Sequence, residues 1–399
     1  MPNPNTWITK LTLLLASSLT VMAGATVAPA LPAMSKHFAE EIANPDVLAT
    51  LVKLIITMPA LFIVIGSPIA GFVVDAVGRK FLLLSATVAY GLAGCSGLFL
   101  RDLTGILVGR ACLGLAVAGV MVSATTLIAD YYTGSDRAAF MGLQAGFMGL
   151  GGVVFLTLGG VLAQQSWRFP FFIYLFAWLI VPMIARFITE PNRQLLMDEN
   201  LSANPPFQPL PVAVLVIIYG LTVISQVAFY LIPVQLPFFL ENLFQAQPTQ
   251  SGMAIALCTL FSAIASVNYG RLKRRINYVG FLPIMLGLMG IGYLIIGQSS
   301  TWAQVLVGLV IFGMGLGILM PNMNVWISNA VSDRFRGRAL SGISTSLFLG
   351  QFLSPLVSQP IARSFGLGAV YVITGIGLTC LALLFAVLKS KVRYLTVNR

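Results

Sequence analysis

The 399-residue sequence carries very little charge, because Asp, Glu, Lys and Arg together make up only 9% of it. Soluble proteins have roughly 25%, which excludes an ordinary water-soluble enzyme. Disorder is excluded as well, since it requires low hydrophobicity and high charge. The sequence holds one histidine, His37, and four cysteines that lie singly in apolar runs without the CxxC spacing of metal sites. We therefore expect no bound metal and no cofactor.

Long apolar runs take the place of charge, with 58% apolar residues and a mean hydropathy of +0.92. A helix needs about 20 apolar residues to cross the hydrocarbon of a membrane. Runs of this kind lie near residues 8–30, 48–74, 81–100, 103–128, 139–162, 169–188, 210–233, 250–269, 279–298, 302–327, 339–361 and 367–388. They are too long and continuous for the strands of a membrane barrel. The predicted fold is an all-α membrane protein with twelve transmembrane helices.

The basic residues are distributed unevenly over the two sides that this topology creates. An even number of helices places both chain ends on one side. That side carries Lys10, Arg79, Lys80, Arg137, Arg186, Arg193, Arg271, Lys273, Arg274, Arg275, Arg334, Arg336, Arg338, Lys389, Lys391, Arg393 and Arg399, and the opposite loops carry Lys36, Arg101, Arg168 and Arg363. Because cytoplasmic loops are enriched in Lys and Arg, we predict that both termini are cytoplasmic. The net charge of +11 then reflects membrane topology rather than nucleic-acid binding.

Weak internal repeats divide the chain into two halves. Pro29 and Pro32 recur as Pro233 and Pro237, Gly71 as Gly270, and the Ser-Asp-Arg of residues 135–137 as residues 332–334. The offset is about 200 residues in each case, which is the pattern of a duplicated unit. A polar stretch at 189–209 separates the halves. The sequence therefore predicts two pseudo-symmetric six-helix bundles, residues 1–188 and 210–399, joined by a cytoplasmic linker at 189–209. Such halves favour alternating access to a site between them.

The loop after the second predicted helix contains Gly71, Asp75, Gly78, Arg79 and Lys80. Gly71 permits close helix contact, and Gly78 permits a tight reversal of the chain. Asp75 lies at a helix end, where a carboxylate can cap the N-terminus of a neighbouring helix or pair with a basic residue. We expect such a contact to close the cytoplasmic side in one state and to break in the other.

These five residues match Gly-x-x-x-Asp-basic-x-Gly-Arg-basic, and the chain resembles the major facilitator superfamily, in particular its twelve-helix drug–proton antiporter branch. Ala76 departs from the pattern at a position where a basic residue is usual. The resemblance implies a monomeric transporter in the inner membrane of a prokaryote. Its partners would be a small-molecule substrate, protons and the lipid bilayer.

Two basic residues fall inside predicted helices. Arg110 lies about 12 Å below the outer helix end at a rise of 1.5 Å per residue, at a depth where a charge must be paired or hydrated. The Arg-x-x-x-Gly pattern of Arg110 and Gly114 resembles that of proton-linked exporters, which implies a part for Arg110 in proton coupling. Bonding to backbone carbonyls of a bent neighbouring helix is the alternative. Lys53 is predicted near the outer interface, where it can extend to the headgroups, with substrate or ion contact as its alternative.

The fifth predicted helix bears on the direction of transport. Exporters of this branch show Gly-Pro-x-x-Gly-Gly there, and the chain keeps Gly159 and Gly160 but has Phe155 and Leu156 in place of Gly-Pro. Gly114, Gly159 and Gly160 are interpreted as helix-packing residues.

Polar residues within the spans are candidates for the substrate cavity, because buried amides and hydroxyls require partners. The candidates are Gln144, Gln226, Tyr230, Asn268, Asn322, Asn324 and Gln351. Hydrogen bonds between helices are the alternative for each. No Asp or Glu lies inside a predicted span, so a cationic substrate is disfavoured relative to a neutral or anionic one.

The resulting hypothesis is a secondary transporter that exports a small, apolar, neutral or anionic compound in exchange for protons. The alternative is an uptake symporter or facilitator for a small nutrient, which the incomplete motif of the fifth helix favours. An enzyme is not expected, because no cluster of nucleophilic or acid–base residues is apparent. ATP-driven pumping is not expected either, since the chain has no phosphate-binding Gly-x-x-x-x-Gly-Lys-Ser/Thr loop.

Overall fold

The computed structural model describes residues 6–191, 212–331 and 333–388, which form helices and connecting turns without a strand. Twelve segments of this part of the chain are long and apolar enough to cross a membrane. The long helices are α1 (Trp7–Ala25), α3 (Pro45–Val77), α4 (Arg79–Gly94), α5 (Leu103–Tyr131), α6 (Gly134–Gln165), α7 (Phe176–Phe187), α9 (Val212–Phe244), α10 (Pro248–Lys273), α11 (Tyr278–Gly297), α12 (Trp302–Ala330), α13 (Asp333–Phe365) and α14 (Leu367–Val387). Shorter pieces extend three of the spans, namely η1 (Ala28–Ala30), α2 (Leu31–His37) and η2 (Phe38–Glu40) after α1, η3 (Cys95–Leu98) after α4, and η4 (Phe169–Leu175) before α7. The predicted all-α fold with twelve spans is confirmed.

Several helices begin at a polar residue that caps the first free backbone amides. The side chain of Asn44 accepts hydrogen bonds from the amides of Asp46 and Val47 at the start of α3. Asp102 accepts one from Gly105 at the start of α5, at 2.6 Å. Thr301 and Gln304 form a reciprocal capping box at the start of α12. Because the first amides of a helix have no partner within the helix, these residues define where the apolar runs become helical.

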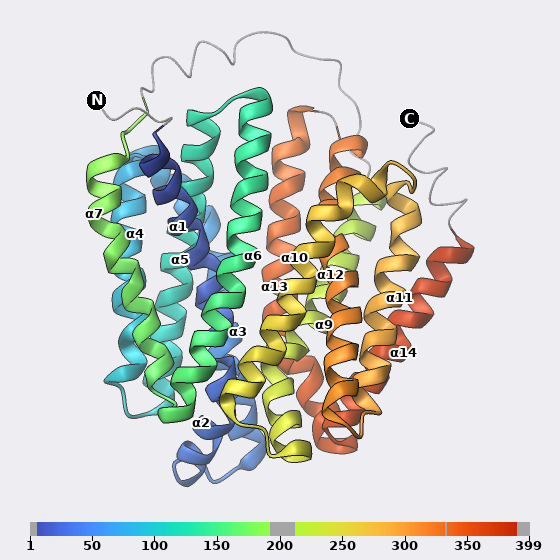
Figure 1. The fold of residues 1–399 in the computed structure, drawn as a ribbon. Coiled ribbons are helices and arrows are strands. Elements are labelled where there is room, and N and C mark those ends of the chain that lie inside the picture. The colour runs from blue at the N-terminus through green and yellow to red at the C-terminus, as the bar shows by residue number, and fades with distance from the viewer. Residues whose placement is uncertain (1–5, 192–211, 332, 389–399) are drawn as a thin grey trace.

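The helices form two bundles that lie side by side (Figure 1). In the first bundle α5 packs against α3 and α4, and in the second α11 packs against α12 and α14. Contact between the bundles is made mainly by α6 with α10 and by α3 with α13. Most of the predicted linker at 189–209 lies outside the described residues, so the boundaries of the two units stay a prediction.

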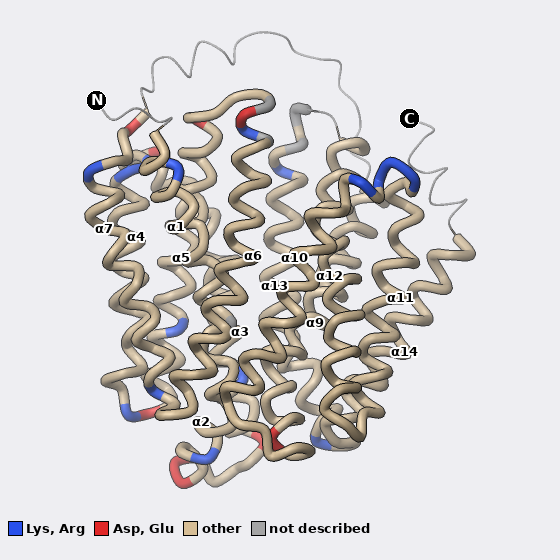
Figure 2. The backbone as a smooth tube through the Cα atoms, in the orientation of Figure 1, with Lys and Arg blue, Asp and Glu red and all other residues tan. Residues whose placement is uncertain are grey.

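Helix α1 begins and α14 ends at the same face of the molecule, where Lys and Arg residues gather (Figures 1 and 2). We call this end the basic face and define it by Arg79 and Lys80 at the start of α4 and by Arg271, Lys273, Arg274 and Arg275 at the end of α10. The chain termini themselves, residues 1–5 and 389–399, lie outside the described part. The arrangement agrees with the charge asymmetry of the sequence, and the compartment that the basic face meets stays a prediction.

Close contacts between helices depend on glycine at the predicted packing positions. A Cβ atom added to Gly114 of α5 would lie 2.4 Å from the carbonyl oxygen of Pro59 in α3. At Gly159 of α6 it would lie 2.1 Å from the carbonyl oxygen of Thr26, which follows α1. At Gly160 it would lie 2.9 Å from the carbonyl oxygen of Pro248, which begins α10 in the other bundle. Small residues let helix backbones approach each other in this way.

We expect Gly114→Ala to lower the melting temperature of the purified protein. The new Cβ would force α3 and α5 apart, at a cost of about 1–3 kcal/mol for overpacking. Gly377→Ala on α14 is the matched control, because Gly377 is exposed and its added Cβ meets no atom within 4 Å. Equal melting temperatures for the two variants would contradict the close contact at Gly114.

Candidate functional site

Arg110 on α5 is completely buried and joins three segments of the first bundle. Its Nε donates a hydrogen bond to the carbonyl oxygen of Ile55 in α3 at 2.7 Å, and its Nη2 donates to the carbonyl oxygen of Ala23 in α1. Its Nη1 donates to the hydroxyl of Tyr174 in η4 at 2.7 Å, and that hydroxyl in turn donates to Ala23 at 3.2 Å. Among the described residues Arg110 therefore binds backbone carbonyls and a phenol and pairs with no carboxylate.

The two carbonyls that receive Arg110 lack their ordinary helical partners. The carbonyl of residue i in a helix accepts from the amide of residue i+4, and the residue four positions after Ile55 is Pro59, which has no N–H. Ala23 lies in the last turn of α1, where carbonyls are left unpaired as the helix ends. The charge of Arg110 is thus stabilised by free carbonyl dipoles at a helix end and at a proline. This corresponds to the alternative stated for Arg110, and its part in proton coupling stays a prediction.

Several polar contacts join the bundles at the face opposite the basic face, and we call three of them, made by Lys36, Asp46 and Lys53, the latch. Lys36, in α2, pairs with Glu241 of α9 at 2.5 Å, and Asp46 of α3 pairs with Arg363 of α13 at 3.0 Å. The ammonium of Lys53 on α3 donates to the side-chain oxygen of Gln359 on α13.

The latch contacts differ in their access to water. The ion pairs are well exposed, with side-chain exposures of 73% and 30% for Lys36 and Glu241, and exposed pairs contribute about 0–1 kcal/mol. Lys53 is only 3% exposed, and its ammonium also lies 5.0 Å from the ring centre of Phe238 in the second bundle. Lys53 is therefore buried between the bundles, and the predicted extension of its side chain to the headgroups is wrong for this conformation.

Between the bundles and nearer the basic face lie three neighbouring hollows of about 590, 430 and 230 Å³, which we call the cleft. The two smaller hollows share Met121, Thr125, Ser344 and Phe348, and the 230 and 590 Å³ hollows share Leu347. Along α3 the latch residues Asp46 and Lys53 come first and the cleft residues 64–71 follow, just before the helix ends next to Arg79. The bundles thus meet at the latch and separate toward the basic face.

Three of the sequence candidates line the cleft. Gln226 of α9 and Gln351 of α13 line the largest hollow, and Gln144 of α6 lines the smallest, where its Nε2 donates to Ser17 of α1 at 2.8 Å. Of the described residues that line the three hollows, none is Asp, Glu, Lys, Arg or His. The described lining of the cleft is therefore polar in places and carries no charge.

The other four candidates are not among the residues that line the cleft. The buried amide of Asn322 accepts a hydrogen bond from Tyr269 at 2.9 Å and donates to the carbonyl of Tyr278 at 3.1 Å, inside the second bundle. Asn268 donates to Ile264 of its own helix, and Asn324 is exposed. The hydroxyl of Tyr230 lies against Gly24 of α1, where the bundles touch.

The loop motif is held by two acidic residues that the sequence reasoning did not single out. The carboxylate of Glu190, which follows α7, accepts hydrogen bonds from the amides of Arg79 and Lys80 at 2.7 and 2.8 Å and so caps α4. Asp130, near the end of α5, pairs with the guanidinium of Arg79 at 3.1 Å. Gly78 has a φ of +96°, which favours glycine, and a Cβ there would lie 2.9 Å from Glu190.

Asp75 makes a weaker contact than the motif suggests. Its carboxylate lies 3.9 Å from Arg79, four residues further along the chain at the start of α4, and its side chain is 71% exposed. Gly71 lines the 430 Å³ hollow, with no atom within 4 Å of an added Cβ. In this conformation the α3 end of the motif is therefore exposed at the mouth of the cleft.

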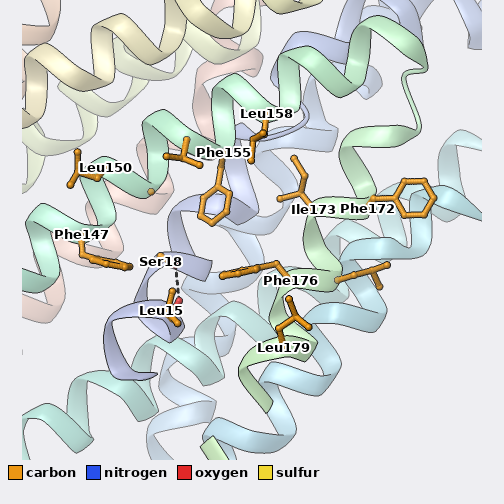
Figure 3. Close-up of a pocket in the computed structure, with 13 residues that line it drawn as sticks. Leu15, Ser18, Phe147, Leu150, Phe155, Leu158, Phe172, Ile173, Phe176 and Leu179 are labelled. Carbon is orange, nitrogen blue, oxygen red and sulfur yellow. Dashed lines mark hydrogen bonds between the residues drawn. The ribbon is translucent and has the colours of Figure 1, made fainter. Parts of the chain in front are cut away.

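A further hollow, of about 740 Å³, lies within the first bundle between α1, α6 and the η4–α7 segment (Figure 3). It is lined by leucine and aromatic side chains such as Phe147, Phe155 and Phe176. Ser18 is the one hydroxyl among its described lining residues, and it donates to the carbonyl of Leu15 at 2.7 Å. A hollow of this composition suits lipid hydrocarbon and offers no free polar group for recognition.

The sequence profile of the Major Facilitator Superfamily matches residues 13–234 and 218–396. The chain belongs to this superfamily. Multidrug resistance protein MdtG of Serratia proteamaculans is 35% identical over 170 residues, a match that spans 41% of each protein. The bacillibactin exporter of Bacillus subtilis is 25% identical over 349 residues, which cover 82% of this chain and 83% of the exporter.

The fold of this superfamily member resembles that of a D-xylose–proton symporter of known crystal structure, with a TM-score of 0.81 and 16% identity over 95% of this chain and 97% of the symporter. At this identity the similarity shows the fold alone. Together with the family match it identifies the chain as a membrane transporter and not an enzyme.

We expect Pro59→Ala to stabilise an Arg110→Met protein by about 1 kcal/mol more than it stabilises the parent, the size of one hydrogen bond. Methionine in place of Arg110 leaves the Ile55 carbonyl without a donor, and alanine in place of Pro59 supplies an amide N–H at the i+4 position. The melting temperature is measured for four purified proteins: the parent, Pro59→Ala, Arg110→Met and the double variant. Pro68→Ala is the control, since Pro68 lies elsewhere on α3. Equal effects of Pro59→Ala in both backgrounds would contradict the carbonyl arrangement.

Proposed function

We propose that this transporter exports a small, largely apolar, neutral or anionic organic compound from the cytoplasm in exchange for protons, by alternating access. The observation that carries the proposal is the asymmetry between the two faces. The latch closes one face, while the cleft between the bundles lies toward the basic face. By the positive-inside rule the basic face is cytoplasmic, so this conformation is open to the cytoplasm.

Export of such a compound is supported by the composition of the cleft and by the names of two relatives. The described residues of the cleft give a cationic compound no carboxylate to pair with, and burying an unpaired charge is costly. MdtG is named a multidrug resistance protein and the Bacillus relative an exporter. We further propose that the protein acts as a monomer in the inner membrane of a prokaryote, with both termini in the cytoplasm.

The opposite conformation would require the cleft to close at the cytoplasmic face. Helices α3 and α13 face each other across the 430 Å³ hollow, with Gly71 on one wall and Ser341 and Thr345 on the other. Closure would bring the exposed carboxylate of Asp75 toward the N-terminal part of α13, where amides and the helix dipole favour a negative charge. In this proposal the carboxylate of Asp75, which faces water in the present conformation, contacts the N-terminal part of α13 when the latch opens.

Uptake of a small nutrient is the second candidate, and Phe155 and Leu156 on α6 favour it. They replace the Gly-Pro that exporters of this branch carry. The direction of flux relative to the proton gradient separates the two candidates.

Cross-linking the latch is expected to stop transport. In a background without the four native cysteines, Lys36→Cys and Glu241→Cys are joined by a bifunctional methanethiosulfonate, and uptake of the neutral fluorescent amine N-phenyl-1-naphthylamine into proteoliposomes is measured. Flux should fall to the level of empty vesicles and return when the cross-link is reduced. The single Lys36→Cys protein, treated in the same way, should keep its flux. Flux that persists through the cross-link would instead indicate a pore.

Exchange with protons predicts accumulation of the same probe in vesicles with an acidic lumen, when the basic face of the protein points outward. The lumen then corresponds to the cell exterior, so protons leave the lumen as the probe enters it. A protonophore should abolish accumulation, and the cross-linked protein serves as the inactive control. Accumulation unaffected by the protonophore would rule out proton coupling, and proton-driven movement out of the lumen would establish uptake.

A further inference from the structure

The largest hollow of the cleft gathers residues from both bundles. Its walls come from α6 of the first bundle and from α9, α10, α12 and α13 of the second. Its volume of about 590 Å³ falls in the range of small-molecule sites. Apolar side chains such as Phe229, Leu316 and Met320 make up much of the surface. The polar groups that remain free on this surface determine which compounds it can recognise.

Several polar side chains of the cleft already have partners. The hydroxyl of Thr259 donates to the carbonyl of Ile255 in its own helix at 3.0 Å. Ser17 donates to Leu13 at 2.7 Å and also accepts the amide of Gln144. A hydroxyl or amide that is bonded within the protein has less capacity left for a ligand.

Gln226 and Gln351 differ from these residues. These two residues are 4% and 9% exposed, and neither side chain makes a hydrogen bond to another described residue. The Oε1 atom of Gln226 is buried and without a partner in the described part of the chain. Leaving such a group unpaired in the folded protein is costly, and native structures rarely do so.

The backbone brings the two amides to neighbouring positions. At Gly350 an added Cβ would lie 2.7 Å from the Cβ of Gln226 and 2.6 Å from the carbonyl oxygen of Val223. Helix α13 therefore touches α9 at the residue just before Gln351 and directly beside Gln226. Each amide provides both an acceptor and a donor, and both side chains line the same hollow.

We infer that Gln226 and Gln351 form the hydrogen-bonding centre of the substrate site, and that the site takes an uncharged, largely apolar compound carrying both a donor and an acceptor, as in a carboxamide. The inference rests on the proposed function and narrows it, because it excludes the anionic compounds that the proposal still admits. A charged group has no counter-charge among the described residues of the cleft, since Arg110 is enclosed by carbonyls. The rest of the compound contacts Phe229, Met320 and their apolar neighbours.

The test uses four probes that share one apolar body: naphthalene-2-carboxamide, 2-naphthoate, 2-naphthylmethylamine and 2-methylnaphthalene. Binding to the purified full-length protein in detergent is measured at pH 7 as the shift in melting temperature with probe concentration. The carboxamide should bind most tightly of the four. Gln226→Leu and Gln351→Leu should each weaken its affinity about tenfold or more, because each removes a buried hydrogen bond and leaves a polar group of the probe unpaired. Affinity for 2-methylnaphthalene should not change.

Asn324→Ala is the matched control, since it removes an amide of the same bundle that does not line the cleft. It should leave the affinity for the carboxamide unchanged. Should a leucine variant fail to fold, Gln226→Glu serves in its place. A carboxylate at this position should bind the amine more tightly than the parent protein does and the naphthoate more weakly.

Three results would overturn the assignment: tighter binding of the naphthoate or the amine than of the carboxamide by the parent protein, no stabilisation by the carboxamide, or equal affinities in the parent and both leucine variants. These results leave the response to the latch cross-link untouched. Conversely, flux that ignores the cross-link would overturn the proposed transport cycle without altering the binding of the probes. The two failures are therefore distinguishable.

Discussion

The buried charge of Arg110 is the constraint around which the first bundle is organised. A guanidinium at this depth in a membrane protein is stable only if every donor that faces the interior finds an acceptor. Pro59 and the end of α1 provide acceptors by breaking the helical bonding pattern at the right places, and the Tyr174 hydroxyl provides another. The same group thus fixes α1, α3 and η4 to α5. A bundle joined in this way can move as one body, which alternating access requires.

Close glycine contacts occur within the first bundle and also between the bundles, where exposed ion pairs are added. Within the first bundle, the backbones of α3 and α5 meet at Gly114, with no room for a single methyl group. Between the bundles, α6 and α10 also meet closely at Gly160, the latch adds two exposed ion pairs and one buried lysine, and the cleft separates the bundles toward the basic face. Exposed ion pairs contribute little and re-form readily. The latch is therefore suited to opening and closing, while the close backbone contact at Gly114 favours an intact first bundle.

The sequence predicts the spans, the loop motif and the depth of Arg110, because each follows from hydropathy, local spacing or the rise of a helix. Gln144, Gln226 and Gln351 could be named as buried amides, but so could Asn322, and nothing local shows that Asn322 is bonded by Tyr269 and Tyr278 inside the second bundle. The partners of the motif, Asp130 and Glu190, also come from segments distant in the sequence. What decides these roles is which helix faces lie opposite each other, and a single sequence does not contain that information.

Because of Lys53, closing the latch requires the free energy of dehydrating an ammonium group, and opening the latch does not. When the latch is closed, its ammonium has lost its water shell and receives in return one amide oxygen and the face of a ring. In the proposed cycle, opening the latch lets water return to the ammonium, so part of the free energy that was needed to dehydrate it is recovered in that step. In the proposed cycle, hydration of a single amine would therefore assist the step that opens the pathway at the latch, the face that the positive-inside rule places outside the cell.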